Sequence, residues 1–286
     1  MCDQAAGLRR RLAFKKDAKQ AKAIAVVSGK GGVGKSSISL NFSLELLRRE
    51  KKVLLMDMDI GMGNIDILLG LNPKYTVMDM FIHRLSIHDI IETGPNGLAY
   101  IAGGSALNTF FTMDQTRQEY FFQQFGQLTE LYDYIIFDMG AGATNDSLFF
   151  ITAADECIVV TTPEPTSITD AYSMIKHIVN NRNNLPIYII MNRSTDYKKG
   201  EKALERFQHV IWHFLHKEVH MMGILPDDKI VSTAVTKQKP FTMLNAKAGI
   251  SKALKALVEN YLYGKPMPNK QAAFSFVERL RNMIAR

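Results

Sequence analysis

Short apolar runs alternate along the chain with stretches in which apolar residues recur every three or four positions. The apolar runs begin at residues 24, 53, 134, 157, 187 and 221, and a brief one lies near residues 100–101. Runs of this length bounded by turn residues are typical of buried strands, whereas the wider spacing is typical of helices. The alternation predicts an α/β fold with a twisted, mainly parallel sheet flanked by helices on both faces.

Five longer stretches show the helical spacing, at residues 37–50, 112–131, 167–183, 200–218 and 246–262. The second stretch is rich in glutamine and phenylalanine. Its side chains Phe121, Phe122 and Phe125 are expected to lie in the core rather than to line a ligand site. A dimer or partner surface is the alternative for them.

The end of the chain shows a separate amphipathic pattern. Residues 265–270 are typical of a linker, and residues 271–286 follow as a short helix. The apolar side of this helix consists of Ala273, Phe274, Phe276, Val277, Leu280, Met283 and Ile284. Arg279 and Arg286 lie outside that side. The pattern suits either a helix on an anionic membrane surface or a helix folded onto its own domain, and the spacing alone favours neither.

Composition suits one large α/β domain or one domain with appendages, and we favour the second. The chain has 286 residues, of which 47% are hydrophobic, enough to bury a sizeable core. No run approaches the roughly 18 consecutive apolar residues of a membrane span, and the charged N-terminus lacks the apolar stretch of a secretory signal. Cys2 and Cys157 form no Cys-x-x-Cys pair. We therefore expect a cytosolic protein that is not an iron–sulfur carrier.

Part of the net charge of +7 is concentrated at the N-terminus. Residues 1–22 carry seven basic and two acidic side chains, and Ala5, Leu8 and Leu12 can share one side of a helix there. A basic tail suits nucleic acid, an anionic membrane or an acidic partner, and it also suits a solvated helix.

Residues 24–36 carry the strongest chemical signal. An apolar run ends in a glycine-rich turn, Gly-Lys-Gly-Gly-Val-Gly-Lys-Ser, and a helical pattern follows. Gly29, Gly34, Lys35 and Ser36 match the phosphate-binding loop, in which backbone N–H groups hold phosphate oxygens, the lysine reaches the terminal phosphates and the hydroxyl binds Mg²⁺. A glycine-rich turn that binds no nucleotide is the alternative. The predicted nucleotide contacts of the loop are Gly29, Gly31, Gly32, Val33, Gly34, Lys35, Ser36 and Ser37.

A second lysine in this turn, Lys30, makes the resemblance specific. With it, the loop resembles the deviant phosphate loop of the MinD/ParA family of P-loop ATPases. The resemblance implies slow ATP hydrolysis with Mg²⁺, and a homodimer that forms with ATP. In that dimer Lys30 would cross the interface to the partner's nucleotide, which gives it a catalytic role beside Lys35. For Lys30 alone, a solvated loop charge is the alternative.

Acidic residues end two of the predicted strands, as a metal–phosphate site requires. Asp57 and Asp59 end the run that begins at residue 53, and residues two apart on a strand point to the same side. Asp138 ends the run that begins at residue 134, and Gly140 can bring its backbone N–H to a γ-phosphate. The resemblance implies that Asp59 positions the hydrolytic water and that Asp57 and Asp138 belong to the Mg²⁺ surroundings. Many family members have proline where Gly140 stands, and glycine at this position is expected of one branch of the family.

Residues that follow two later strands are candidates for contacts with the base. Asn192 ends the run that begins at residue 187, and its amide can donate and accept against the N6/N7 edge of adenine. A local turn contact is the alternative. The family resemblance supports the base contact and adds Arg193, Pro226 and Asp227 at the same edge.

The two ends of the chain resemble the FlhG branch of the family, whose members are also named FleN or YlxH. Residues 3–9, Asp-Gln-Ala-Ala-Gly-Leu-Arg, are similar to its activator motif, which binds the signal-recognition-type GTPase FlhF and stimulates GTP hydrolysis. The resemblance implies an activating set of Asp3, Gln4, Leu8 and Arg9, in which Gln4 orients the attacking water. It also implies flagellar C-ring proteins as partners and control of flagellar number and placement.

The same resemblance divides the chain into four parts. These are an activator segment at residues 1–22, an ATPase domain at 23–264, a linker at 265–270 and a membrane-targeting helix at 271–286. The helix would hold the ATP-bound dimer on the inner face of the cell membrane through Phe274, Phe276, Val277, Leu280, Met283 and Ile284.

Three other functions stay open. A MinD-type ATPase would position the division septum, but it leaves residues 3–9 unexplained. A ParA-type ATPase would bind DNA through surface lysines, and the terminal amphipathic helix argues against it. A non-catalytic adaptor for the GTPase, which ATP would hold in one conformation, would differ from the proposed ATPase only in that hydrolysis is not needed for its function.

Four histidines, His209, His213, His216 and His220, recur at spacings of four, three and four. If residues 200–218 form one helix, the first three share a face and two of them can hold a metal. Since no aspartate or cysteine completes such a site, we expect a solvated or partner-facing surface instead.

Overall fold

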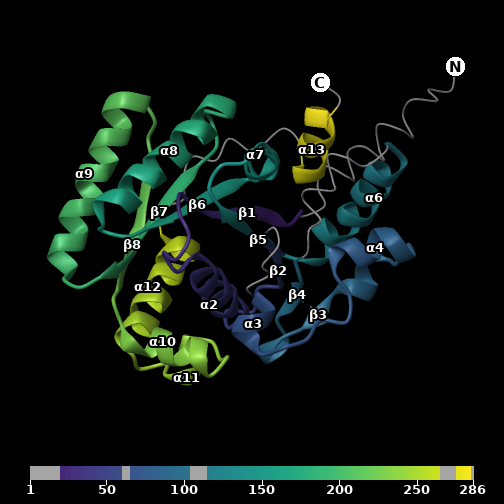
Figure 1. Cartoon of the computed structure of the whole chain (residues 1–286), viewed down its shortest axis with the longest axis horizontal. Coiled ribbons are helices and arrows are strands. Elements are labelled where there is room, and N and C mark those ends of the chain that lie inside the picture. Colours follow the sequence, from purple (N-terminus) through teal and green to yellow (C-terminus); the bar gives the residue numbers. More distant parts are fainter. Residues whose placement is uncertain (1–19, 60–64, 104–114, 265–274, 285–286) are drawn as a thin grey trace, which may run out of the picture.

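An eight-stranded sheet forms the centre of the molecule (Figure 1), in a computed structural model that describes residues 20–59, 65–103, 115–264 and 275–284. Its strands are β1 (Lys22–Ser28), β2 (Val53–Met58), β3 (Glu92–Thr93), β4 (Ala99–Ile101), β5 (Tyr134–Ala141), β6 (Glu156–Thr161), β7 (Ile187–Ser194) and β8 (His220–Pro226). They lie in the order β3-β4-β2-β5-β1-β6-β7-β8, and all neighbours are parallel except β3 and β4. The strands predicted from the apolar runs are confirmed.

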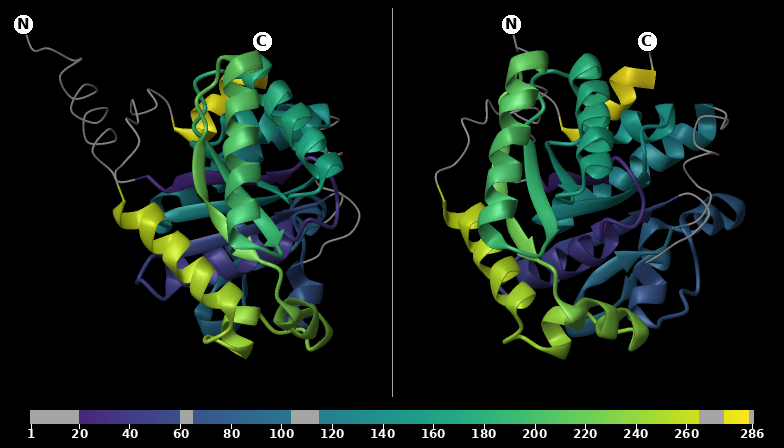
Figure 2. Two further views of the ribbon diagram at one scale, coloured as in Figure 1. Left: turned by 90° about the vertical axis from the view of Figure 1, so that its left-hand side faces the viewer. Right: turned by 60° about the vertical axis from the view of Figure 1, so that its left-hand side comes forward.

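Helices cover both faces of the sheet, which is why the central strands are apolar on both sides (Figures 1 and 2). One face packs against α2 (Lys35–Leu47), α3 (Ile65–Leu69), α10 (Lys229–Thr236), α11 (Phe241–Leu244) and α12 (Gly249–Tyr263). The other packs against α4 (Val77–His83), α6 (Gln115–Leu131), α7 (Asn145–Ala153), α8 (Pro165–Asn181), α9 (Tyr197–Leu215) and α13 (Phe276–Ile284). Two short 3₁₀ turns, η1 (Ile87–Ile90) and η2 (Pro95–Gly97), lie near β3. The predicted α/β fold is confirmed.

The predicted helices are found at bounds shifted by up to three residues, and two of the shifts have a clear local cause. Helix α2 begins at Lys35, directly after Gly34, which adopts a left-handed conformation. Helix α9 ends at Leu215 because His216 is left-handed, with φ of 49°, and its N–H bonds to the carbonyl of Trp212. The prediction that one helix continues to residue 218 is therefore wrong. The predicted core positions Phe121, Phe122 and Phe125 of α6 are buried.

The C-terminal helix α13 packs against the domain, on the side of α6 and α7 (Figure 1). Leu280 is fully buried, and the Phe276 ring lies 4.9 Å from that of Phe137 and 5.7 Å from that of Phe125, between ring centroids. Arg279 donates to the carbonyl of Ala153 over 2.6 Å and forms an ion pair with Asp155, two residues further along the chain. Of the predicted helix at residues 271–286, the structure describes the part at Phe276–Ile284, in which Arg279 is held by the domain instead of being available to lipid. Of the two alternatives, the folded-back helix is the one observed.

No helix among the described residues combines the length and the apolar character that a bilayer crossing requires. The predicted residues Asp3, Gln4, Leu8, Arg9 and Phe274 lie outside the described residues.

Candidate nucleotide-binding site

The glycine-rich turn joins β1 to α2 at the carboxyl edge of the sheet, the edge at which ligands bind in open α/β folds. Gly32 and Gly34 have φ of 77° and 93°, a region that residues with a Cβ rarely adopt. A Cβ added at Gly31 or Gly32 would meet no atom within 4 Å, so the outer side of the turn is open. Helix α2 begins after Gly34 without a side-chain cap, so its first N–H groups have no capping side chain and remain available to an anion at the loop.

Gly29 differs from the other loop glycines because it packs against another helix. A Cβ at this position would lie 2.2 Å from the backbone carbonyl carbon of Asp170 in α8. Close packing of the loop on α8 therefore requires glycine here, a reason that is separate from the predicted phosphate contact.

We expect Gly29→Ala to lower the free energy of unfolding by about 3 kcal/mol or more, the upper end of overpacking effects, because the obstructing atoms belong to the backbone. Urea denaturation followed by circular dichroism measures this. Gly31→Ala is the matched control in the same loop, and it should change the free energy of unfolding by no more than about 0.5 kcal/mol. Equal effects of the two substitutions would contradict the packing role of Gly29.

Lys35 and Asp138 form a buried ion pair beneath the loop. The Nζ atom of Lys35 lies 2.7 Å from Oδ1 of Asp138 and donates to the Ser36 hydroxyl over 3.2 Å. The hydroxyl of Ser39 also donates to Asp138 Oδ1, over 2.8 Å. The structure thus brings the predicted phosphate lysine, Mg²⁺ hydroxyl and strand-end acid together, and it adds Ser39, which the sequence analysis missed.

Three buried side-chain oxygens in the described part of the chain have no hydrogen-bond partner: Asp138 Oδ2, Thr162 Oγ1 and Asn192 Oδ1. Asp138 lies on β5, Thr162 directly after β6, and Asn192 on β7. In the sheet these strands lie in the order β5-β1-β6-β7, and all of them are parallel. Unpartnered buried polar atoms are rare in folded proteins, and they need an explanation such as a ligand. Two of the three were predicted as ligand contacts, while Thr162 was not.

The chemistry of these donors suits Mg²⁺. A free carboxylate oxygen of Asp138 and the hydroxyl of Ser36 are oxygen ligands, and Mg²⁺ uses one or two such protein groups together with phosphate oxygens. Ser36 and Asp138 therefore fit the ion as predicted.

Asp57 lies beside Asp138 on the neighbouring strand, and its carboxylate accepts hydrogen bonds from backbone N–H groups. Its two carboxylate oxygens accept from the N–H of Asp59 over 3.0 Å and from that of Ile65 over 3.1 Å. Strand β2 ends at Met58, so the strand alternation invoked for Asp57 and Asp59 does not reach the second residue. Asp57 thus fixes the backbone on both sides of residues 60–64.

Asp59 lies beside Gly140, the glycine that follows Asp138 by two residues. A Cβ at Gly140 would come within 3.3 Å of Asp59 Oδ1, so any larger residue would crowd this carboxylate. The absence of a side chain at the position where the family more commonly has proline therefore leaves room for the carboxylate of the predicted water-positioning residue.

The side chain of Lys30 forms hydrogen bonds within its own chain. Its Nζ atom donates to Oε2 of Glu164 over 2.9 Å and to the hydroxyl of Thr166 over 3.0 Å, at the start of α8. This hydrogen bond, followed by the charge of Lys30, lowers the pKa of Glu164 below its usual value. Because both side chains are accessible to solvent, the pair is weak and can exchange its partners.

The residues predicted near the base lie at the ends of β7 and β8, which are paired at Ser194 and Pro226. The amide of Asn192 donates to the carbonyl of Val33 in the glycine-rich turn over 2.7 Å, while its oxygen is unpartnered. The N–H of Asp227 donates to the carbonyl of Ser194 over 3.0 Å. Arg193 is exposed and left-handed, with φ of 54°. The four predicted residues therefore share one edge, next to the phosphate loop.

The predicted histidine run does not form one surface. His209 and His213 are exposed on α9 with their rings stacked 6.3 Å apart, whereas His216 follows the helix and His220 opens β8. Within the described ranges, no group of three His, Cys, Asp or Glu residues is placed to hold a metal ion.

Comparison with known proteins places the fold and the site in context. A family model described as "ParA: NUBPL iron-transfer P-loop NTPase" matches residues 19–262. The antiactivator FleN of Pseudomonas aeruginosa is 32% identical over 90% of this chain and 92% of its own length. The flagellum site-determining protein YlxH of Helicobacter pylori is 32% identical over 76% of this chain and 74% of its own length. Among solved structures, the MinC:MinD cell division protein complex of Aquifex aeolicus superposes with a TM-score of 0.69 at 25% identity, covering 88% of this chain and 100% of that one. The family match ends before α13.

Proposed function

The chain is an FlhG-like member of the ParA/MinD family of P-loop ATPases, and from this premise we propose that it is an ATP-dependent switch that controls flagellar number and placement. The proposal joins three parts: an ATP site that closes a homodimer, a terminal helix that binds the membrane and an N-terminal segment that activates a second enzyme. As an ATPase, the protein hydrolyses ATP to ADP and phosphate.

The observation that carries the ATP site is the unpartnered buried oxygen of Asp138, whose other carboxylate oxygen binds the buried Lys35, together with the unpartnered buried oxygens of Thr162 and Asn192. The N-terminus of α2 and the open glycine turn would bind the phosphates, and Lys35 would turn from Asp138 toward them. Ser36 and Asp138 would hold Mg²⁺, which neutralises phosphate charge when it is bound. The free oxygen of Asn192 would accept from the adenine amino group.

Turnover would depend on residues at the edge of the site. Asp59, whose carboxylate lies where a Cβ at Gly140 would crowd it, would align the attacking water beside the γ-phosphate. Lys30 would leave Glu164 and reach the nucleotide of a second copy of the chain, which the weakness of the exposed pair permits. The homodimer would therefore form only when ATP is present.

Membrane association would require α13 to leave the domain, because its apolar side chains Phe276 and Leu280 are covered by α6, α7 and β5. One short helix binds an anionic membrane weakly, whereas the two helices of a dimer gain avidity. ATP would thereby move the protein from the cytoplasm to the inner face of the membrane.

The flagellar part of the proposal rests on the relatives and on residues 3–9. YlxH is named as a flagellum site-determining protein, and the N-terminal sequence resembles the activator motif of FlhG proteins. Asp3, Gln4, Leu8 and Arg9 would engage an FlhF-type GTPase, and flagellar C-ring proteins would be further partners. No nucleic acid is part of this proposal.

The test is GTP turnover by an FlhF-type GTPase in the presence of the full chain. We expect severalfold or greater stimulation by the wild type, and little by Gln4→Ala, because the glutamine orients the attacking water. A peptide of residues 1–22 should reproduce the effect of the full chain. If saturating wild type leaves turnover unchanged, the flagellar assignment fails and division-site positioning by a MinD-type ATPase becomes the leading function.

A further inference from the structure

The chain between β8 and α12, residues 227–248, starts at the base side of the proposed ATP site. This β8–α12 connection leaves Pro226, forms α10 and α11 and returns to the sheet at α12. Asp228 closes its two ends, since its carboxylate accepts from the N–H of Ile230 over 3.0 Å and from that of Ile250 over 3.3 Å. The far end of the connection is α11. Because Asp228 joins the two ends of the connection, the contacts that hold α11 also restrict where the first residues of the connection, beside the base, can lie.

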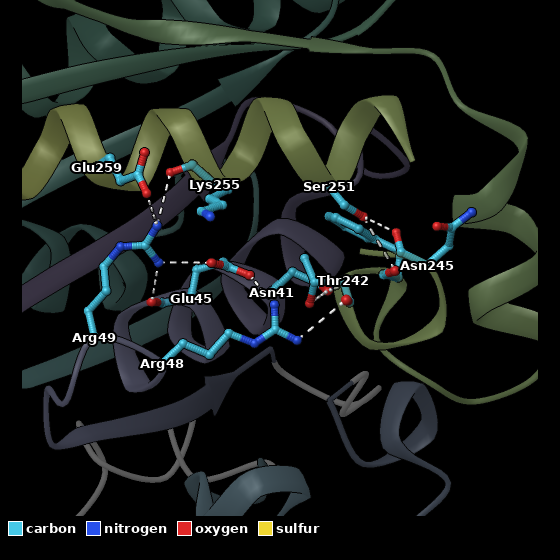
Figure 3. Close-up of polar contacts among 10 residues, drawn as sticks. Asn41, Glu45, Arg48, Arg49, Thr242, Asn245, Ser251, Lys255 and Glu259 are labelled. Atoms are coloured by element: carbon cyan, nitrogen blue, oxygen red, sulfur yellow. Dashed lines mark hydrogen bonds and ion pairs between the residues drawn. The ribbon is translucent and has the colours of Figure 1, made fainter. Parts of the chain in front are cut away.

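The far end is held by α2, through the buried side chain of Asn41 and through Arg48, which donates to the carbonyl of Thr242 over 3.4 Å (Figure 3). The side-chain oxygen of Asn41 accepts from both the N–H and the hydroxyl of Thr242 in α11, over 3.0 and 2.8 Å. Its amino group donates to the carbonyl of Ser37 in the first turn of α2, over 2.8 Å. A single amide thus bonds the phosphate-binding turn on one side and the β8–α12 connection on the other.

A second set of contacts ties the carboxyl end of α2 to α12, farther from the phosphate loop (Figure 3). Buried Glu45 pairs with Arg48 and Arg49, and Arg49 also lies 3.0 Å from Glu259 of α12. The side chain of Glu259 is 48% exposed, so its ion pair contributes little. The pair of Arg49 with Glu259 joins α2 to α12 rather than to α11, and it involves neither Asn41 nor Thr242, which makes Glu259 a control position.

We propose that Asn41 is a positioning residue that fixes the base side of the ATP site at the correct distance from its phosphate side. The inference rests on the proposed placement of the base at the ends of β7 and β8. ATP must be contacted at both ends together, and a preorganised site avoids the cost of ordering the connection when the base binds. Inorganic tripolyphosphate, which has no base, gains nothing from this alignment.

The test compares binding of Mg²⁺–ATP and of Mg²⁺–tripolyphosphate by calorimetry, using the full chain. For Asn41→Leu, which removes all three hydrogen bonds at similar volume, we expect ATP affinity to fall about tenfold or more while tripolyphosphate affinity changes less than about twofold. Thr242→Val, which removes one of these bonds, should shift ATP affinity in the same direction by less. Glu259→Gln should leave both affinities unchanged.

Other outcomes separate the inference from its premise. If the two ligands lose affinity equally in Asn41→Leu and Thr242→Val, these residues support only the phosphate helix, and the inference is wrong. If neither variant weakens ATP binding, it is also wrong. Should Asn41→Leu fail to fold, Thr242→Val alone decides between these results. A wild type that binds ATP no more tightly than tripolyphosphate would instead overturn the proposed base site itself.

Discussion

Replacing Lys35 by methionine should abolish ATP turnover and also lower the free energy of unfolding by about 3–5 kcal/mol. The Lys35 side chain is 7% exposed and Asp138 is fully buried, with 2.7 Å between Nζ and Oδ1. Without the lysine, the buried carboxylate keeps only the hydroxyl of Ser39 as a partner in this contact. Turnover should fall by at least about 100-fold, because the lysine would stabilise charge that develops on the phosphates.

The double substitution of Lys35→Met with Asp138→Asn separates these two effects. Removing both charges should restore most of the lost free energy of unfolding, since a buried pair replaced as a whole costs little. Turnover should stay at the level of the single variant, because both groups belong to the proposed site. Urea denaturation and phosphate release measure the two quantities. If Lys35→Met is as stable as the wild type, the ion pair of Lys35 and Asp138 is not buried from water in the way that the structure shows.

The parts of this site that lie close together in the sequence could be predicted from it. The glycine turn, Lys35 and Ser36 occupy one continuous segment, and a strand that ends in Asp138 is a local pattern. Their meeting at one edge follows from parallel strands, whose carboxyl ends lie together. Local chemistry and a simple topology rule were therefore sufficient for the centre of the site.

Contacts between distant segments could not be predicted in this way. Nothing near Gly29 in the sequence indicates that the backbone of Asp170 lies where its Cβ would be. The pairing of Lys30 with Glu164 and that of Asn41 with Thr242 likewise join residues more than a hundred positions apart. Such contacts depend on how α8 and α11 pack on the sheet, which periodicity does not determine.

The amphipathic pattern of α13 shows the same limit. Its spacing identified an apolar side, and the structure confirms that Phe276 and Leu280 are on it. A lipid surface and an apolar groove of the protein both select such a side, so the pattern could not tell which one covers it. The contacts of Arg279 with Ala153 and Asp155 provide what the sequence lacked.

Because Arg279 helps to hold α13 on the domain, Arg279→Gln should increase the fraction of protein bound to anionic vesicles about tenfold in the absence of ATP. Arg279 donates to the Ala153 carbonyl over 2.6 Å and to the Asp155 carboxylate over 2.6 Å, at the carboxyl end of α7. The substitution weakens docking of α13 but leaves its apolar side chains intact. Vesicle co-sedimentation with phosphatidylglycerol measures the effect.

Two further substitutions on α13 make this result specific. Arg281→Gln removes an exposed pair with Glu119, in which the side chains are 52% and 63% exposed, and it should have little effect although it removes the same charge. Leu280→Ser removes the fully buried side chain at the centre of the apolar side, and it should abolish vesicle binding with or without ATP. If Arg279→Gln and Arg281→Gln behave alike, docking on α7 does not limit membrane binding. If Leu280→Ser still binds vesicles, α13 is not the segment that enters the membrane surface, and the basic N-terminal segment is the next candidate.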